Sequence, residues 1–204
     1  MTDAHAVPTG FLGAPPASDA AQRLYEADVA DLGFVMNNSR VWAHAPALHD
    51  QLFELLTTAA DVAGLTLRQR GILVAACAST KGDSYCSLAW GTKLAAAAGP
   101  EVSAGVLTGE DSLLDAPETA LATWARRITR DANSAGPADV QVLRDAGYDD
   151  AQILAITAFV AGRIAYSTVN DALGALPDEQ FTLVAPAAVR RAVTYGRPIA
   201  APGD

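Results

Sequence analysis

Apolar residues recur along the chain at intervals of three and four positions, which is the spacing of one face of an α-helix, and no alternating strand pattern persists. Residues that begin or end helices separate these apolar stretches. We therefore predict an all-α helical bundle. The predicted helices span residues 19–31, 46–63, 66–81, 83–98, 117–132, 137–145, 149–173 and 186–195, with a short segment at 34–42 and a polar connection at 100–116.

Two helix starts carry clear signals. Thr66 and Gln69 have the form of a capping box, in which a hydroxyl and a side-chain amide satisfy free backbone N–H groups. Asp83 is suited to cap the next helix, because Asp is a preferred N-cap residue. Residues 72–77 and 153–160 are apolar on nearly every side, so we expect both segments to be buried, the second in a central helix.

The chain divides into three parts by composition. Residues 1–18 contain Pro and Gly with little apolar periodicity and are predicted to form a flexible arm, residues 19–176 form the helical domain, and residues 177–204 form a C-terminal helix and a tail that is disordered beyond Pro198. In the helix at 46–63, one apolar face is predicted from four leucines, namely Leu48, Leu52, Leu55 and Leu56.

The formal net charge is −9, and the chain has only two lysines, Lys81 and Lys93. Nucleic acids and anionic membranes bind clustered Lys and Arg, so we expect neither as a partner. The N-terminal residues lack the pattern of a signal peptide, and no apolar run reaches the roughly 20 residues of a membrane span. Together with the two cysteines, Cys77 and Cys86, these features predict a cytoplasmic protein, with a disulfide between them as the less favoured alternative.

Candidate chemistry concentrates at residues 83–91. Cys86 stands there three residues after Asp83 and four residues before Trp90. This is the spacing of a Cys-x-x-Cys-x-x-x-His motif in which one cysteine is kept and two partners are replaced. The surrounding segments are Gly-Phe-Val-Met-Asn at 33–37, Ala-His-Ala-Pro-Ala-Leu at 43–48, Leu-Thr-Leu-Arg-Gln-Arg at 65–70 and Asn-Asp-Ala-Leu-Gly at 170–174. In order and spacing, this set resembles the alkylhydroperoxidase D-like proteins of the carboxymuconolactone decarboxylase superfamily, especially their peroxidase-related branch, over residues 24–176.

The resemblance implies an AhpD-like helical bundle that needs no cofactor. In peroxidases of this family the second cysteine attacks the peroxide, the first resolves the product, and a histidine and a glutamate relay protons. Carried over by position, Cys86 is the attacking cysteine and Asp83 replaces the resolving one. Trp90 replaces the histidine, on which decarboxylating relatives also rely, and the glutamate falls near Gly71. One of the four catalytic positions is therefore retained.

Cys86, which is retained, and Asp83, which replaces a cysteine, each have two interpretations. A helix start lowers the pKa of the Cys86 thiol, whereas a carboxylate at Asp83 raises it. Cys86 is thus either a reactive thiol or a small residue kept for packing. Asp83 is either a helix cap, which we favour, or a general acid or base whose pKa is raised by burial.

Three further residues belong to the predicted site. Tyr85 either donates a hydrogen bond into it or only packs. Trp90 shares a helix face with Cys86 and is expected to fill the pocket or stack on a flat ligand. Lys81 either supplies a cation at the mouth of the pocket or is solvated. The sequence therefore places Cys86, Asp83 and Tyr85 in the catalytic role and Trp90 and Lys81 in the pocket.

Two other groups of polar residues are candidates for a site, a pair of histidines and a polar stripe. His44 and His49 are five residues apart and have no partner Cys or carboxylate cluster, so we expect no metal site. Arg163, Tyr166 and Asn170 have the spacing of one helix face and form a polar stripe. A hydrogen-bond network between subunits is the favoured interpretation of that stripe.

We therefore predict an alkylhydroperoxidase-like oxidoreductase that acts through Cys86 alone, on a small-molecule hydroperoxide, with an external thiol as reductant. The first alternative is a cofactor-free acid–base enzyme, such as a decarboxylase, isomerase or cyclase, that uses Asp83. The second alternative is a ligand-binding protein without catalysis. A homo-oligomer is expected, because the family assembles through helical faces and residues 153–160 are more apolar than a small monomer requires.

Overall fold

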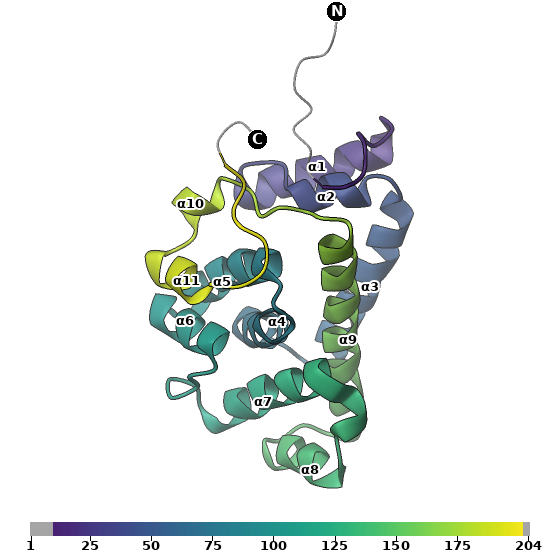
Figure 1. The fold of residues 1–204 in the computed structure, drawn as a ribbon. Helices are drawn as coiled ribbons and strands as arrows, with labels where there is room; N and C mark the ends of the chain where they lie inside the picture. Colours follow the sequence, from purple (N-terminus) through teal and green to yellow (C-terminus); the bar gives the residue numbers. More distant parts are fainter. Residues whose placement is uncertain (1–9, 202–204) are drawn as a thin grey trace, which may run out of the picture.

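The computed structural model describes residues 10–201, and every regular element within them is a helix (Figure 1). The elements are α1 Asp19–Leu32, α2 Asn37–Trp42, α3 Pro46–Val62, α4 Leu67–Lys81, α5 Ser84–Ala98, α6 Pro100–Thr108, α7 Ala116–Asp131, the 3₁₀ turn η1 Ala132–Ser134, α8 Pro137–Asp145, α9 Asp150–Ala172, α10 Phe181–Val184 and α11 Ala187–Ala192. The predicted all-α fold is confirmed.

Helix α4 lies at the centre of the bundle. It packs against α5, α6, α7 and α9, and Figure 1 shows it nearly end-on between them. Its residues from Gly71 to Ala78 are all buried, as the unbroken apolar run predicts. The capping box at its start is present: the hydroxyl of Thr66 accepts from the backbone N–H of Gln69, whose side-chain oxygen accepts from the backbone N–H of Thr66.

A tight turn joins α4 to α5 and fixes the start of the candidate motif. Gly82 ends α4 in the left-handed conformation at φ 78°, which glycine adopts without the strain a side chain would bring. Asp83 follows as the N-cap of α5, and its Oδ1 atom accepts from the backbone N–H of Cys86 at 2.9 Å. The predicted helix cap is therefore formed.

Helices α3 and α9 lie side by side along one flank of the bundle (Figure 1). The four leucines predicted on one face of α3 are not all buried: Leu56 is buried and Leu52 half-buried, whereas Leu48 and Leu55 are 61% and 50% exposed. Helix α9 thus covers only part of this leucine face. On α9 itself Leu154 is 71% exposed.

Helix α9 is long and apolar enough to cross a membrane when judged by length and composition alone. Core helices of soluble proteins pass the same test, and half of its most apolar window is buried inside the bundle. The central position predicted for residues 153–160 holds on the side of Ile156 and Val160, which are fully buried.

Two segments differ from the sequence prediction. Residues 100–108 form α6 rather than part of a connection, because Pro100 opens a helix whose Val106 and Leu107 are buried against the core. The C-terminal helix predicted at 186–195 is shorter, since α11 ends at Ala192, and the one-turn helix α10 precedes it.

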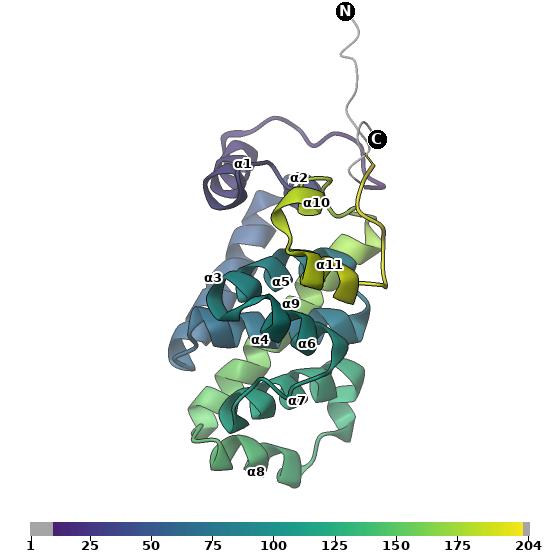
Figure 2. The same cartoon turned by 90° about the vertical axis from the view of Figure 1, so that its left-hand side faces the viewer.

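The two terminal segments pack on the bundle near one another (Figure 2). Residues 1–9 of the predicted arm lie outside the described residues, but the backbone N–H of Phe11 donates to the carbonyl of Leu173 at 2.7 Å. The C-terminal segment, residues 193–201, runs over the start of α5. Its Arg197 carbonyl accepts from Ser84 Oγ at 2.7 Å, and its Ala200 N–H donates to the carbonyl of Pro177 at 2.8 Å.

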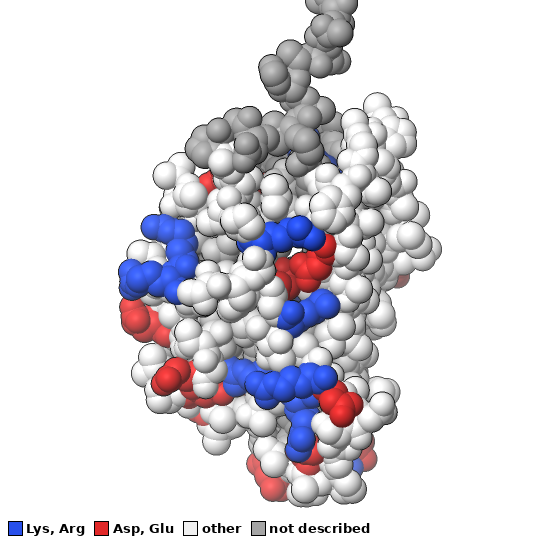
Figure 3. Space-filling model, in the orientation of Figure 1, with Lys and Arg blue, Asp and Glu red and all other residues white. Residues whose placement is uncertain are grey.

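Basic side chains on the face shown in Figure 3 lie beside acidic ones rather than in a field of one sign. Among the described residues, three arginines pair with aspartates within 3 Å: Arg126 with Asp111, Arg127 with Asp139 and Arg144 with Asp150. The more exposed of them, Arg127 with Asp139 and Arg144 with Asp150, contribute little to stability, about 0–1 kcal/mol each. Each of these three pairs balances a positive charge locally.

Candidate functional site

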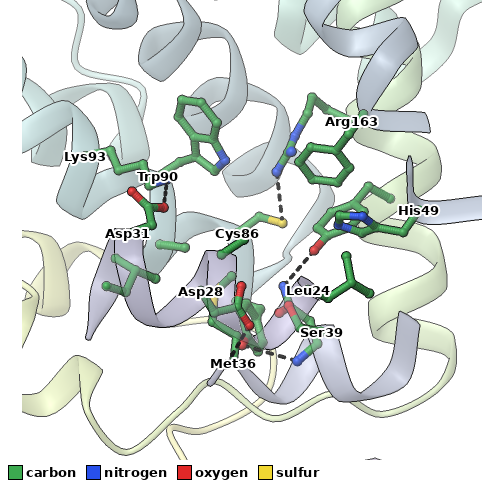
Figure 4. A pocket seen from close by; sticks show the side chains of 17 residues that line it. Leu24, Asp28, Asp31, Met36, Ser39, His49, Cys86, Trp90, Lys93 and Arg163 are labelled. Atoms are coloured by element: carbon green, nitrogen blue, oxygen red, sulfur yellow. Dashed lines mark hydrogen bonds and ion pairs between the residues drawn. The ribbon is translucent and has the colours of Figure 1, made fainter. Parts of the chain in front are cut away.

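A cavity of about 300 Å³ lies between α1, α2, α3, α5 and α9 (Figure 4). Its apolar wall includes Leu24, Met36, Phe53, Tyr85, Ala89, Trp90 and Tyr166. Its polar and charged wall residues include Asp28, Asp31, Asn38, His49, Cys86, Lys93 and Arg163. The volume suits a small organic molecule.

Cys86 lies in the wall of this cavity, on the first turn of α5. It is 3% exposed, and its Sγ atom is 3.6 Å from Nη2 of Arg163 on α9 (Figure 4). Burial raises the pKa of the Cys86 thiol well above its usual value, and the Asp83 carboxylate raises it further. The positive charge of Arg163 acts in the opposite direction. The resting thiol is therefore protonated, with a cation placed to stabilise the thiolate once it forms.

Asp83 lies beside Cys86 but is not among the residues that line the cavity. It is fully buried, with Oδ1 engaged in the helix cap. Its Oδ2 atom has no hydrogen-bond partner among the described residues. Asp83 is therefore placed to act on the Cys86 thiol through its charge, and a ligand in this cavity does not touch it.

Arg163 is the cation in contact with the Cys86 sulfur, and it is 4% exposed. Its guanidinium carbon lies 4.9 Å from the ring centroid of Tyr166, 5.4 Å from that of Trp90 and 6.0 Å from that of Phe53. Aromatic faces attract cations at such distances. Three rings and a thiol thus surround the buried cation.

Trp90 lines the cavity together with Cys86, as their shared helix face predicts. Lys81 does not line it; the lysine in the wall is Lys93, which pairs with Asp31 of α1 at 2.5 Å and lies over the Trp90 ring at 5.4 Å. Lys81 is instead the last residue of α4, near Asp171, and its charge opposes the rise that burial causes in the pKa of Asp171, to about 6.

Tyr85 lines the cavity but directs its hydroxyl into a buried hydrogen-bond network. The hydroxyl donates to Asp178 and accepts from the backbone N–H of Asn38 at 3.3 Å. Burial raises the pKa of Tyr85 well above its usual value, so the phenol stays protonated. The side-chain amide of Asn38 in turn donates to the hydroxyl of Tyr166 at 3.0 Å. Tyr85 is thus held by the fold, and its oxygen has little freedom to reach a ligand.

The polar stripe of α9 faces the interior of the same chain. Arg163 contacts Cys86, Tyr166 accepts from Asn38, and Asn170 Oδ1 accepts from the indole N–H of Trp42 at 2.9 Å. All three stripe residues are buried. The hydrogen bonds of the stripe are therefore intramolecular, which corrects the favoured interpretation of a network between subunits.

Two cavity residues were missed by the sequence reasoning. His49 of α3 was tested only as a metal ligand, yet its ring stacks on Phe53 at 4.2 Å between centroids, and burial lowers its pKa, so the neutral imidazole is favoured. Asp28 of α1 is 6% exposed, and burial raises its pKa. Its Oδ2 accepts from the backbone N–H of Met36 at 3.0 Å. An aspartate on the inner face of an amphipathic helix is the signal that could have indicated Asp28.

The position at which the dithiol peroxidases carry their glutamate has no room for a side chain in this protein. A Cβ atom on Gly71 would lie 3.1 Å from both Cβ and Cδ1 of Leu94, so α4 and α5 pack together where an acidic side chain would stand. Both cysteines are free, and no group of three metal-ligating side chains occurs within residues 10–201. The cavity thus contains one thiol, one neutral histidine and carboxyl groups on the α1 wall.

Comparison with known proteins places the fold. No protein-family model matches the sequence, and no curated protein matches it. Among solved structures, the AhpD-core, peroxidase-related protein from Ralstonia eutropha JMP134 is similar, with a TM-score of 0.75 and 23% identity over 88% of this chain and 97% of that one. A peroxidase-related protein from Silicibacter sp. TM1040 has a TM-score of 0.72 and 22% identity over 85% of this chain and 94% of that one.

A third similar structure is a cysteine-to-alanine variant of the debrominase Bmp8 in complex with 2,3,4-tribromopyrrole, with a TM-score of 0.66 and 15% identity over 89% of this chain and 95% of that one. At these identities the likeness shows the fold. The chain therefore has the AhpD-like fold, as the motif resemblance predicts. Within that fold it carries a cavity with a single thiol.

Proposed function

We propose that this protein is an AhpD-like oxidoreductase in which the Cys86 thiol alone reduces a small organic hydroperoxide. The observation that supports this proposal is the contact between Cys86 Sγ and the buried guanidinium of Arg163, 3.6 Å away, in the wall of a cavity of about 300 Å³. A thiolate is the nucleophile in such chemistry, and a fixed cation stabilises it in an enclosed, mostly apolar site.

In the proposed step, Cys86 loses its thiol proton and its sulfur attacks the terminal oxygen of the hydroperoxide. The S–O bond forms as the O–O bond breaks, and the departing alkoxide takes up one proton. One thiol and one hydroperoxide thus give a sulfenic acid and an alcohol. Arg163 stabilises the negative charge on the sulfur and the charge that develops on the departing oxygen.

The proton for the departing alkoxide comes from the α1 wall in this proposal. Asp28 lines the cavity, and burial raises its pKa, which favours the protonated carboxyl that can donate. His49 is the second candidate donor, although its lowered pKa makes the protonated form less populated. The histidine position of dithiol peroxidases is thereby replaced by groups from other helices.

An external thiol completes the cycle. Asp83 occupies the position of a resolving cysteine, and Cys77 is 1% exposed in the core. A first external thiol therefore condenses with the sulfenic acid and releases water. A second external thiol then takes the outer sulfur of the mixed disulfide, which restores Cys86 and leaves an oxidised disulfide product.

The test is intact-mass analysis of the reduced protein during titration with hydrogen peroxide, cumene hydroperoxide and tert-butyl hydroperoxide. We expect one oxygen atom to be added at stoichiometric hydroperoxide in the parent protein and in Cys77→Ser, and none in Cys86→Ser. Adding a small thiol then converts the product to a mixed disulfide. Oxidation of Cys86 no faster than that of an ordinary free thiol would overturn the proposal. The reagent 2,3,4-tribromopyrrole belongs in the same panel, because the Bmp8 complex shows that this fold holds it.

The acid–base alternative is favoured by a different observation. Asp28, rather than Asp83, is the buried carboxyl group that lines the cavity, and its raised pKa suits a general acid or base. In this second candidate function Asp28 transfers protons to a small molecule and Cys86 is a wall residue. Turnover that is lost in Asp28→Asn but kept in Cys86→Ser and Asp83→Asn would establish it. Saturable binding without turnover would leave the non-catalytic alternative.

A further inference from the structure

Arg163 is a buried cation that lacks a carboxylate partner. It is 4% exposed, and no ion pair joins it to an acidic group in the described part of the chain. Its Nε atom has no hydrogen-bond partner there either. Burying a charge without a paired counter-ion costs several kcal/mol, so a site that keeps one usually has a use for it.

The groups around Arg163 are neutral in the resting protein. The Cys86 thiol is protonated, and Trp90, Tyr166 and Phe53 offer only the partial negative charge of their ring faces. The nearest acidic neighbour of the thiol, Asp83, uses one oxygen in the α5 cap and forms no ion pair with the guanidinium. A guanidinium has five N–H donors in a planar array, of which a single one contacts Cys86.

The unpaired positive charge of the cavity lies at Arg163. Of the two cations in the wall, Lys93 is already paired with Asp31, at 2.5 Å. Figure 4 shows Arg163 on one side of Cys86 and Asp28 on the other. Burial raises the pKa of Asp28, which favours its neutral form, so a negatively charged group entering the cavity is attracted to Arg163 without strong repulsion from the α1 wall.

The shape of the site also limits the ligand. The rings of Trp90, Phe53 and Tyr166 all lie within 6.0 Å of the guanidinium carbon, and the cavity holds about 300 Å³. Flat ring systems make favourable offset-stacked or edge contacts with such side chains. A ligand that satisfies both features has an acidic group attached to a compact, flat apolar body.

We propose that the cavity recognises a compact, flat organic acid, whose anionic group binds Arg163 while its apolar body lies against the aromatic wall next to Cys86. The anionic group is a carboxylate or an ionised ring. This inference rests on the proposed function: the hydroperoxide that Cys86 reduces is one whose organic part is such an acid. Arg163 then has two roles, to hold the substrate anion and to stabilise the thiolate.

The test compares two alkylating reagents of nearly equal size, iodoacetate and iodoacetamide, in a Cys77→Ser background. In both reactions the Cys86 sulfur bonds to the CH₂ carbon, iodide leaves, and the thiol proton goes to solvent. Any change in the pKa of the thiol affects both rates equally, so their ratio reports on charge recognition alone. The variants are Arg163→Gln, Arg163→Lys and, as a matched control, Arg130→Gln on an exposed arginine.

We expect the ratio of the iodoacetate rate to the iodoacetamide rate to fall at least ten-fold in Arg163→Gln, equivalent to about 1.4 kcal/mol. Arg163→Lys should recover part of it, and Arg130→Gln should leave it unchanged. In the unsubstituted protein, benzoate should slow iodoacetamide labelling more than benzyl alcohol does at equal concentration. This last comparison needs no variant, so it stands even if Arg163→Gln does not fold.

An equal rate ratio in all variants, together with equal protection by benzoate and benzyl alcohol, would overturn the inference. Its failure is distinct from failure of the proposed function. Peroxide oxidation of Cys86 without charge preference keeps the peroxidase proposal and removes the organic-acid substrate. Charge preference without peroxide oxidation keeps the binding site and removes the peroxidase.

Discussion

The hydroxyl of Tyr85 donates a hydrogen bond to the carboxylate of Asp178, which joins the first turn of α5 to the segment that precedes α10. The second oxygen of Asp178 accepts from the backbone N–H of Asn37 at 2.9 Å, at the start of α2. One carboxyl group thus connects three parts of the chain around the cavity. Burial raises its pKa from 3.8 to about 6, despite the opposing effect of the Tyr85 bond.

The raised pKa of Asp178 predicts that stability falls as pH rises through about 6. The folded state binds the proton more tightly than the unfolded chain does, so this contribution is fully present below pH 4 and is lost between about pH 4 and 6. Asp178→Asn should flatten this part of the profile, by up to roughly 3 kcal/mol in the free energy of unfolding. Urea unfolding at several pH values measures it.

The control for that experiment is Asp139→Asn. Asp139 is half-buried and has a lowered pKa, owing first to the hydrogen bond from the Gly136 N–H, so its substitution should not change the slope between pH 4 and 6. Tyr85→Phe removes the bond that lowers the pKa of Asp178 and should shift the loss of stability to higher pH. Identical profiles for the parent protein and Asp178→Asn would contradict the prediction.

The reactivity of Cys86 should respond in opposite directions to its two charged neighbours. After burial, the Asp83 carboxylate is the next cause of the raised thiol pKa, and Arg163 lowers it. Asp83→Asn should therefore speed iodoacetamide labelling at pH 7 several-fold, and Arg163→Gln should slow it. Asn caps helices about as well as Asp does, so α5 should keep its start. Slower labelling of Asp83→Asn, measured by mass spectrometry, would show that charge does not govern this thiol.

Introducing the missing glutamate at position 71 as a single substitution should destabilise the protein. Gly71→Glu places a carboxyl group against Leu94, where even a Cβ atom has only 3.1 Å of space, so we expect a loss of about 3 kcal/mol or more. Leu94→Ala alone should cost about 2–5 kcal/mol by leaving a cavity. The double variant should lose less than the sum of the two, because the new side chain occupies that cavity. Additive losses in a double-mutant cycle would refute this steric account.

We propose that the exposed apolar residues of α3 and α9 form the interface of a homo-oligomer. Leu48, Leu55 and Val62 are seven residues apart and each at least 50% exposed, and Leu154 lies on the neighbouring helix with 71% exposed. Leu55→Glu and Leu154→Glu together should shift the protein toward monomer in light scattering. Leu183→Glu, on the 86% exposed Leu183 of α10, is the matched control. A parent protein that is already monomeric at high concentration would remove the proposal.

Local signals in the sequence predicted most of the fold. The caps at Thr66 and Asp83 and the stop at Gly82 are determined by neighbouring residues, so the helix boundaries around the motif could be placed in advance. Residues 100–116 are predicted to be a connection because the stretch is polar and contains glycine, yet residues 100–108 form α6. The burial of Val106 by the core outweighs those signals.

The cavity was less predictable than the motif, because its wall comes from five helices spread over residues 19–172. Cys86 and Trp90 both line it, as their position on one helix face predicts, whereas their roles stay a prediction. Asp28 and His49 required knowledge of how α1 and α3 pack across α5, which no local spacing encodes. Likewise, the α9 stripe was identified from its period, but its partners could not be, because they lie more than 70 residues away in the sequence.

The C-terminal segment has a consequence for the order in which the protein is assembled during synthesis. Ser84 at the start of α5 donates a hydrogen bond to the carbonyl of Arg197, and Ser87 accepts one from the hydroxyl of Tyr195 at 3.1 Å. Each bond joins residues more than 100 positions apart, so it can form only after the C-terminal segment has been made. A Cβ atom at Gly196 would lie 2.6 Å from the carbonyl of Gly82, which shows how closely the two backbones approach. A nascent chain on the ribosome therefore leaves this end of α5 uncovered until residues 195–200 emerge, so the start of the thiol-bearing helix reaches its final packing only at the end of synthesis.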